Sequence, residues 1–172
     1  MAKKYFLLII LSCFIGLTQT DTHATDLGIN AGVLLPADKF NHAADTGFGI
    51  GSQIKLHVFE DFYYGLAVNY GSAKGNNGVD FWEVDLYPFV DWIFFRPKKT
   101  DVFVRGGIGL SHWESDGIWW LDDEGNGVAV TFGMGCKTAK NLEVTACFTK
   151  LYADFDVDYF TIKLGYNFYI GD

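Results

Sequence analysis

The sequence predicts an all-β protein: one eight-stranded, antiparallel, up-and-down transmembrane β-barrel that follows a signal peptide. Three observations support this prediction. Apolar residues alternate with small or polar ones along the chain after residue 25, the second face is rich in glycine, and short connections alternate with longer polar ones. A chain of 172 residues has room for a single domain.

Residues 1–24 have the order of a secretory signal peptide. Two lysines precede an apolar run over residues 5–17, and the residues after this run are small or polar. The run is about five to seven residues too short for a comfortable membrane-spanning helix. We therefore expect residues 1–24 to be removed on export and residues 25–172 to form the barrel domain. Acylation of Cys13, as in a lipoprotein, is the alternative.

The composition argues against a nucleic-acid partner and suits a barrel in lipid. Without the two lysines and one aspartate of residues 1–24, the formal net charge changes from −8 to −9, whereas phosphate binding requires clusters of Lys and Arg. Aromatic residues reach 17%, glycines number 20, and only 20% of the residues are charged. Many aromatics and few charges are typical of a protein whose outer surface contacts lipid.

The eight predicted strands are recognised by their period-two alternation. In the first strand, apolar residues stand at odd positions from Leu27 to Leu35, between Gly28, Asn30 and Gly32. In the other seven, the apolar residues stand at even positions. These segments are Phe48–Val58, Tyr64–Tyr70, Trp82–Trp92, Val102–Leu110, Val128–Met134, Leu142–Phe148 and Phe160–Ile170. A bilayer-spanning strand takes about nine to eleven residues, and most of these strands reach that length.

The face between the apolar positions distinguishes a membrane barrel from a soluble fold. It carries mainly glycines, small residues and scattered charges. Glycine weakens a strand that faces water, but it suits the narrow interior of an eight-stranded barrel. Closure also satisfies the backbone hydrogen bonds without water. We therefore expect the bulky apolar face to contact lipid. A soluble sandwich or lipocalin-like barrel is the alternative.

The connections between the predicted strands alternate in length. We expect short turns at 59–62, 96–101 and 138–141, and mostly longer polar loops at 36–46, 72–79, 114–126 and 153–158. Such alternation is expected for periplasmic turns and extracellular loops. Pro88 falls within the fourth strand, where a proline in a closed sheet predicts a bulge.

Eight charged residues fall on the predicted inward face, four of each sign. They are Lys55, Glu83, Asp85, Asp91, Arg105, Lys137, Glu143 and Lys163. Because buried charges must be paired, we expect a salt-bridged plug that fills the lumen. A gated polar pathway is the alternative, although eight strands enclose no aqueous channel. With a dry plug, Arg105→Ala or Glu83→Ala should destabilise the barrel by about 3–5 kcal/mol.

The two cysteines after residue 24 are expected to be free. A turn at 139–141 pairs Cys136 with Val144 and Cys147 with Gly133. The two thiols then lie on opposite faces, with their residues roughly 10 Å apart along the strand. A disulfide needs Cα atoms within about 7 Å.

The predicted loops hold two further candidates. Trp119 and Trp120 stand among acidic residues in the loop 114–126, and exposed aromatics of this kind predict a contact site for a surface partner. They could equally fold over the barrel mouth or enter the membrane interface. Alternating acids at Asp154, Asp156 and Asp158 suit either a divalent cation that bridges lipopolysaccharide or a solvated hairpin tip.

The last strand carries the most specific signal. Residues 163–170 read Lys-Leu-Gly-Tyr-Asn-Phe-Tyr-Ile, in which Lys163, Gly165, Phe168 and Ile170 resemble the C-terminal signal recognised by the outer-membrane barrel assembly machinery. The usual pattern ends on a terminal aromatic residue, whereas two further residues, Gly and Asp, follow here.

With this signal, the first strand and the segment 103–110, the chain resembles the small outer-membrane barrels related to the OmpA transmembrane domain and the OmpX/Ail group. The resemblance implies a monomer in the bacterial outer membrane, in contact with lipid and lipopolysaccharide, and inserted by the barrel assembly machinery. It leaves the activity open, because one fold hosts many functions.

No catalytic, cofactor or metal site is predicted. Ser111, His112, Glu114 and Ser115 contain the residue types of a lipid A deacylase, but they do not match the His-x-Ser-Asn arrangement of that family. We find no zinc-ligand spacing and no glycine-rich phosphate loop. We expect a non-enzymatic protein with a structural or surface-interaction role. A lipid-A-modifying enzyme and a narrow channel for small solutes are the alternatives.

Overall fold

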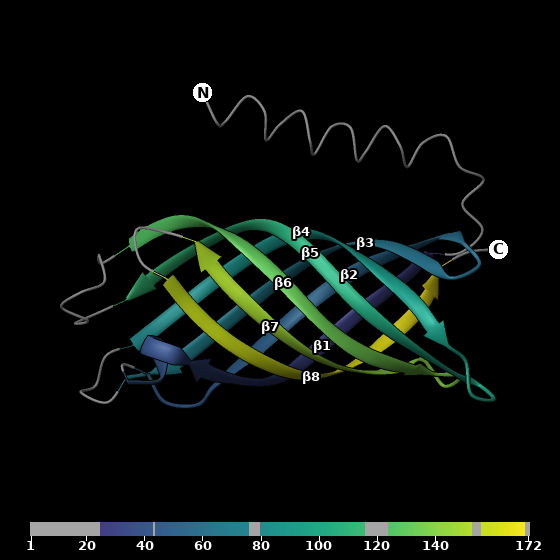
Figure 1. Cartoon of the computed structure of the whole chain (residues 1–172), viewed down its shortest axis with the longest axis horizontal. Coiled ribbons are helices and arrows are strands. Elements are labelled where there is room, and N and C mark those ends of the chain that lie inside the picture. The colour runs from purple at the N-terminus through teal and green to yellow at the C-terminus, as the bar shows by residue number, and fades with distance from the viewer. Residues whose placement is uncertain (1–24, 43, 76–79, 116–123, 153–155, 171–172) are drawn as a thin grey trace, which may run out of the picture.

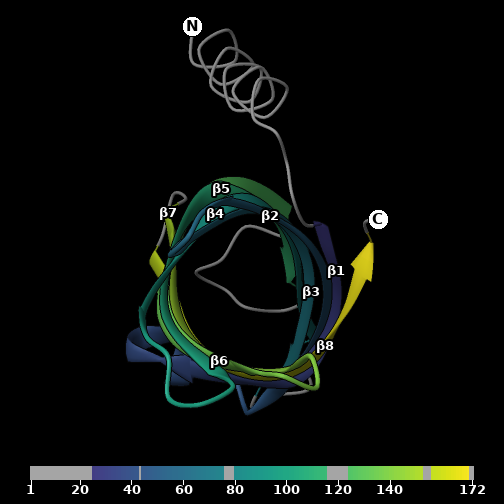
Figure 2. The same ribbon diagram turned by 90° about the vertical axis from the view of Figure 1, so that its right-hand side faces the viewer.

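The computed structural model describes residues 25–42, 44–75, 80–115, 124–152 and 156–170. Eight strands form one closed barrel in which each strand is antiparallel to its neighbours in chain order (Figures 1 and 2). The strands are β1 (Thr25–Ala37), β2 (Gly47–Phe59), β3 (Phe62–Lys74), β4 (Asp80–Phe95), β5 (Thr100–Ser115), β6 (Glu124–Thr138), β7 (Leu142–Tyr152) and β8 (Asp156–Ile170). The predicted fold class is confirmed.

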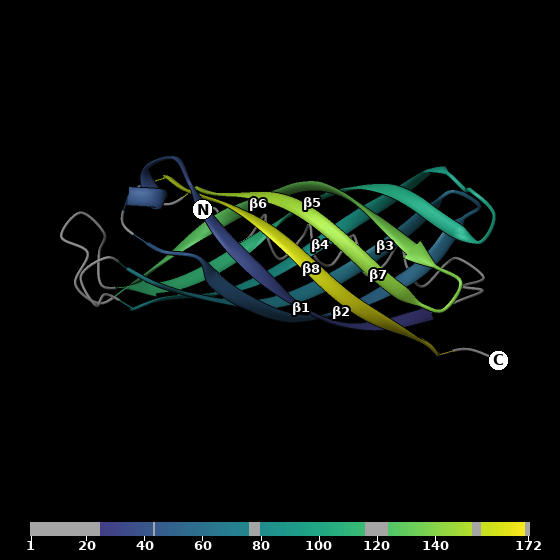
Figure 3. The same cartoon turned by 90° about the horizontal axis from the view of Figure 1, so that it is seen from below.

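The barrel is closed by pairing between its first and last strands. β1 and β8 lie side by side, with Thr25 opposite Ile170 and Ala37 opposite Asp158 (Figure 3). Following paired residues once around the barrel from Thr25 leads to Leu35, ten residues further along β1. A stagger of this size makes the strands tilt strongly against the barrel axis, by roughly 40°.

The two ends of the barrel differ, and we name them by their connections. The turn end holds the start of β1, the end of β8 and the short turns at 60–61, 96–99 and 139–141. The loop end holds the 3₁₀ helix η1 (Asp38–His42) and the ends of β3, β5 and β7 (Figure 1). No helix in the described ranges is long and apolar enough to cross a membrane.

The tight turns at the turn end depend on residues in the left-handed region. Lys98 and Asn141 have φ values of 58° and 61°. Asn141 donates its N–H to the carbonyl of Thr138 at 2.9 Å, and Thr100 donates to that of Pro97 at 3.2 Å. Asparagine tolerates this conformation better than most residues with a side chain, so it suits a connection of three residues.

The outward face is an apolar belt. Exposed side chains between the two ends include Ile29, Ile54, Leu66, Val68, Ile108, Met134, Val144, Ile162 and Leu164. Aromatic residues flank this belt; on β4, Trp92 stands towards the turn end and Trp82 towards the loop end, ten residues apart. At about 3.3 Å per residue and a tilt of about 40°, ten residues span roughly 25 Å along the axis, the height of the apolar band of a membrane barrel.

Many inward positions are occupied by glycine, because the neighbouring strands leave no room there for a side chain. A Cβ on Gly32 would collide with the carbonyl oxygen of Ile162, and one on Gly109 with that of Leu86. Gly106 is the contrasting case, since it faces outward and a Cβ there would meet nothing within 4 Å. Close packing against neighbouring strands therefore explains why glycine occupies these lumen-facing positions.

The bulge expected at Pro88 is not found. β3 pairs through this position without interruption, with Leu66 opposite Pro88. The β4–β5 pairing skips Tyr87 and Pro88 but resumes at Phe89 in the same register, because a missing N–H removes a ladder bond without requiring an inserted residue. The register shift of this strand pair lies near the turn end instead, between Ile93 and Phe95.

Candidate functional site: a closed lumen

The half of the lumen near the turn end is filled by four charged side chains, which we call the ion network: Lys55, Asp91, Arg105 and Glu143. Lys55 Nζ lies 2.8 Å from Asp91 Oδ2 and 2.6 Å from Glu143 Oε2. Arg105 Nε lies 2.7 Å from Asp91 Oδ1, and its Nη2 lies 3.1 Å from Glu143 Oε1. All four residues are buried, so each cation meets both anions in a closed set.

Amides and aromatic rings complete the surroundings of the ion network. Gln53 donates to Glu143 Oε1 at 3.1 Å and accepts from Arg105 Nη1 at 3.1 Å, and Asn167 donates to Glu143 Oε2 at 2.9 Å. The guanidinium carbon of Arg105 lies 4.1 Å from the centre of the Phe89 ring. Buried charge is tolerated where the remaining donors and acceptors are satisfied, as they are here.

A second ion pair lies closer to the turn end. Lys137 Nζ contacts Asp26 Oδ2, and it stands 5.7 Å from the centre of the Tyr63 ring. Asp26 was absent from the predicted set, although it continues the inward series of Gly28 and Asn30 in the first strand. Extending that alternation by one step would have found it.

The two remaining acids, Glu83 and Asp85, lie towards the loop end; we call them the acid pair. Glu83 is 2% and Asp85 4% exposed, yet neither takes part in an ion pair found among the described residues. Tyr159 donates its hydroxyl to Asp85 Oδ2 at 2.9 Å. Asp85 Oδ1 and Glu83 Oε2 are buried and have no hydrogen-bond partner in the described part of the chain.

Lys163 lies in the same half of the lumen without pairing with either acid. Its Nζ donates to Asn69 Oδ1 at 2.8 Å, and Asn69 in turn donates to the Tyr87 hydroxyl at 2.9 Å. The expectation that all eight inward charges neutralise one another therefore needs correction. The structure joins four of them in the ion network and pairs Lys137 with Asp26. Glu83, Asp85 and Lys163 form no direct ion pair with any residue that the structure describes.

At the loop end the lumen is closed by a cluster of buried residues, the apolar cap: Leu34, Phe40, Ala44, Ala73, Phe81, Trp113, Leu151, Val157 and Tyr159. Phe40 comes from η1, and its ring packs edge-on against Phe81 with centroids 4.8 Å apart. Tyr159 links the cap to the acid pair, because its ring lies in the cap and its hydroxyl reaches Asp85.

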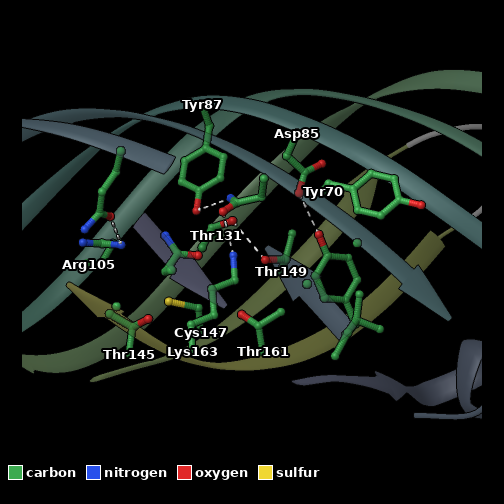
Figure 4. A pocket seen from close by; sticks show the side chains of 18 of the residues that line it. Tyr70, Asp85, Tyr87, Arg105, Thr131, Thr145, Cys147, Thr149, Thr161 and Lys163 are labelled. Carbon is green, nitrogen blue, oxygen red and sulfur yellow. Dashed lines mark hydrogen bonds between the residues drawn. The ribbon is translucent and has the colours of Figure 1, made fainter. Parts of the chain in front are cut away.

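A cavity of about 20 Å³ lies in the lumen between these two closures. Asp85, Thr131, Thr149, Thr161 and Lys163 line it and point into it from different strands (Figure 4). Its lining also includes Glu83 and Tyr159. On such a scale there is room for about one or two water molecules, and none for a continuous aqueous path.

The catalytic geometry of a lipid A deacylase is not assembled at the residues considered from the sequence. Ser111 is buried and faces the lumen, whereas His112 follows it on the outward face. His112 Nδ1 lies 3.2 Å from Asn126 Oδ1, and its ring packs edge-on against Trp82. Neighbouring residues of one strand point to opposite faces, so Ser111 and His112 cannot act together.

The structure also gives the positions of the two cysteines and of the candidate assembly signal. Cys136 lies opposite Val144 and Cys147 opposite Gly133, as the sequence predicted, and both cysteines are free. In the candidate assembly signal, Phe168 and Ile170 face outward while Lys163 faces the lumen. Trp119, Trp120 and Asp154 lie outside the described residues.

No family model and no curated protein matches the chain. Solved structures do. The N-terminal β-barrel domain of Pseudomonas aeruginosa OprF is 18% identical, with a TM-score of 0.51, over 86% of this chain and 100% of that one. Neisserial surface protein A is 13% identical, with a TM-score of 0.56, over 84% and 97%. The outer-membrane enzyme PagL is 13% identical, with a TM-score of 0.58, over 82% and 98%.

These three structures are a surface protein, an enzyme and a domain of a larger protein, so the likeness concerns architecture. At such identities the activity of any one of them does not transfer to this chain. The closed eight-stranded barrel, its apolar belt and these matches lead to one conclusion: the chain has the fold of the small eight-stranded outer-membrane β-barrels.

Proposed function

We propose that this protein is an integral outer-membrane barrel with a structural or surface-interaction role, and that it neither conducts solutes nor catalyses a reaction. The main support for this proposal is that the lumen, which lies inside an apolar belt, is closed at two levels. The ion network fills the barrel near the turn end, and the apolar cap fills it near the loop end. A solute would have to break both closures to cross.

Conductance in planar lipid bilayers tests the closed lumen. We expect no steady conductance from the purified protein, with an open porin of known conductance as the positive control. The buried salt bridges and the cap should keep water from forming a continuous column. Steady single-channel steps from the wild-type protein would contradict the proposal and favour a narrow channel.

Membrane location is tested by fractionation and by heat modifiability. The proposal includes export by a signal peptide over residues 1–24, and insertion with the short turns in the periplasm. We expect the protein in the outer-membrane fraction, with different electrophoretic mobility before and after boiling, because a closed barrel resists unfolding in mild detergent. Recovery of a folded protein from the soluble periplasm would contradict this location.

The surface-interaction part of the proposal concerns Trp119 and Trp120, which the sequence places in the longest loop. Changing both to Ser should leave the amount of inserted protein unchanged and alter protease access to the loop in intact cells, because loops carry recognition while strands supply the scaffold. The comparison variant changes Phe168 and Ile170 to Ser. It should lower membrane yield, since these two residues belong to the proposed assembly signal. Loss of insertion in the Trp variant would assign the pair to barrel packing.

A further inference from the structure

We propose that the acid pair, Glu83 and Asp85, binds one dehydrated monovalent cation, Na⁺ or K⁺, inside the lumen beneath the apolar cap. This site is separate from the proposed structural and surface role. It would explain how two carboxylates remain buried without an ion-pair partner.

The acid pair places two carboxylates in the lumen without an ion-pair partner among the described residues. Glu83 and Asp85 are two residues apart on β4, so both carboxylates point into the lumen from the same strand. One oxygen of each, Glu83 Oε2 and Asp85 Oδ1, is buried without a hydrogen-bond partner among the described residues. An ionised carboxylate removed from water is costly unless a counter-charge lies close to it.

The cavity that holds the acid pair is lined by further residues with side-chain oxygens. Both acids line the same internal cavity, together with Tyr159, Thr149 and Thr161. Figure 4 shows Asp85, Thr149 and Thr161 around it. Ser111, which lies opposite Asp85 on β5, is also buried, although it does not line the cavity itself. Carboxylate and hydroxyl oxygens are the ligands that hard cations prefer.

The cavity limits both the size and the charge of a bound ion. The cavity volume of about 20 Å³ admits a particle the size of a water molecule, and excludes a hydrated ion or an organic cation. Arg105 and Glu143 also line this cavity, but they pair with each other within the ion network. Lys163 is the remaining cation of the lining, and its Nζ donates a hydrogen bond to Asn69. With all three groups ionised, two carboxylates and one ammonium leave a single negative charge, which a monovalent cation balances and a divalent cation would exceed.

The test compares cations at equal ionic strength. The purified protein is refolded into detergent micelles in NaCl, in KCl, or in the chloride of N-methyl-D-glucamine, which is too large for the cavity, and the unfolding midpoint is measured. Refolding in each salt is necessary because the site lies beneath the cap. We expect a higher midpoint in NaCl or KCl than in the N-methyl-D-glucamine salt. Glu83→Gln should abolish that difference, and the matched control Glu114→Gln, at an exposed outward position, should keep it.

A charge variant makes the test falsifiable even if Glu83→Gln folds poorly. Lys163→Gln raises the residual charge of the site from one negative to two, so Ca²⁺ or Mg²⁺ should then raise the midpoint more than it does for the wild-type protein. Equal wild-type midpoints in all three monovalent salts would overturn the proposal and assign the balancing charge to a proton. A Lys163→Gln variant without any gain from divalent cations would overturn it as well. Neither result would bear on the conductance test of the closed lumen.

Discussion

The two halves of the lumen are closed by different means. Near the turn end, two cations and two anions saturate one another, and the amides of Gln53 on β2 and Asn167 on β8 take up the remaining hydrogen bonds. Near the loop end, bulky side chains close the barrel by volume, and the acid pair beneath them has no ion-pair partner in the described part of the chain. The ionic closure depends on exact partners, whereas the apolar closure depends on filled space.

This difference changes how each half responds to mutation. Removal of one member of the ion network leaves buried charge of the opposite sign behind. Removal of a ring from the apolar cap leaves a cavity into which neighbouring side chains can partly relax. The following variants separate the two kinds of closure.

The largest expected effect comes from Asp91→Ala. This carboxylate accepts from both Lys55 and Arg105, so its loss leaves two buried cations dependent on Glu143 alone. We expect the free energy of unfolding to fall by about 3–5 kcal/mol, as for other broken buried pairs. Urea unfolding in detergent measures it. Asp61→Ala is the control, because its ion pair with Arg96 is about half-exposed and worth roughly 1 kcal/mol or less. Equal effects of the two variants would contradict the saturated network.

The corresponding change in the apolar cap is Phe40→Ala. Phe40 is fully buried against Phe81, and truncation of a buried Phe costs about 3–5 kcal/mol. We expect a loss near 3 kcal/mol, because η1 is a helix of only five residues that can settle into the space left behind. Asn41→Ala, at an exposed position of the same helix, should change stability by less than about 0.5 kcal/mol. Planar-bilayer recordings should still show no steady conductance, since the ion network remains. A conducting Phe40→Ala variant would show that the cap alone closes the lumen.

Much of the fold could be predicted from the sequence because alternation fixes which residues share a face. The eight strands, the inward position of Lys55 and Arg105, and the pairing of Cys147 with Gly133 all follow from period and turn position. Alternation does not say which inward residues meet across the lumen. That depends on the ten-residue stagger around the barrel, which places Lys55 beside Glu143 rather than beside Glu83.

Two features of the site could not be predicted from the period-two alternation, for other physical reasons. Phe40 enters the cap from η1, where no period-two pattern marks a buried residue. Tyr159 spans the lumen to reach Asp85, a contact that depends on the length of its side chain. The error at Pro88 came from treating a missing hydrogen bond as an inserted residue, although the strand keeps its register without that bond.

A smaller effect is expected from a pair of glycines on one strand. Gly109 faces the lumen, where an added Cβ would collide with backbone and side-chain atoms of Leu86 and Tyr87, whereas Gly106 faces outward into open space. Gly109→Ala should lower the free energy of unfolding by about 1–3 kcal/mol through overpacking. Gly106→Ala should leave it unchanged or raise it by up to about 1 kcal/mol, since alanine has less freedom to lose on folding. The same urea titration measures both, and a neutral Gly109→Ala would contradict close packing of the inward face.

The smallest effect on stability should come from modification of Cys136. Comparing the labelling of Cys136 and Cys147 distinguishes the outer face of the barrel from its lumen. Cys136 is half-buried on the outward face of β6, whereas the Cys147 side chain is buried in the lumen wall against Gly133. A small uncharged maleimide that dissolves in detergent or lipid should therefore label Cys136 in the folded barrel and reach Cys147 only after unfolding. Mass spectrometry of Cys136→Ser and Cys147→Ser assigns each label. Because the reagent on Cys136 extends away from the packed interior, the labelled protein should keep its unfolding midpoint. Labelling of Cys147 at the rate of Cys136 would mean that the lumen wall opens in the native state, and the distinction between a lipid-facing surface and a closed interior would fail at the β6–β7 pair.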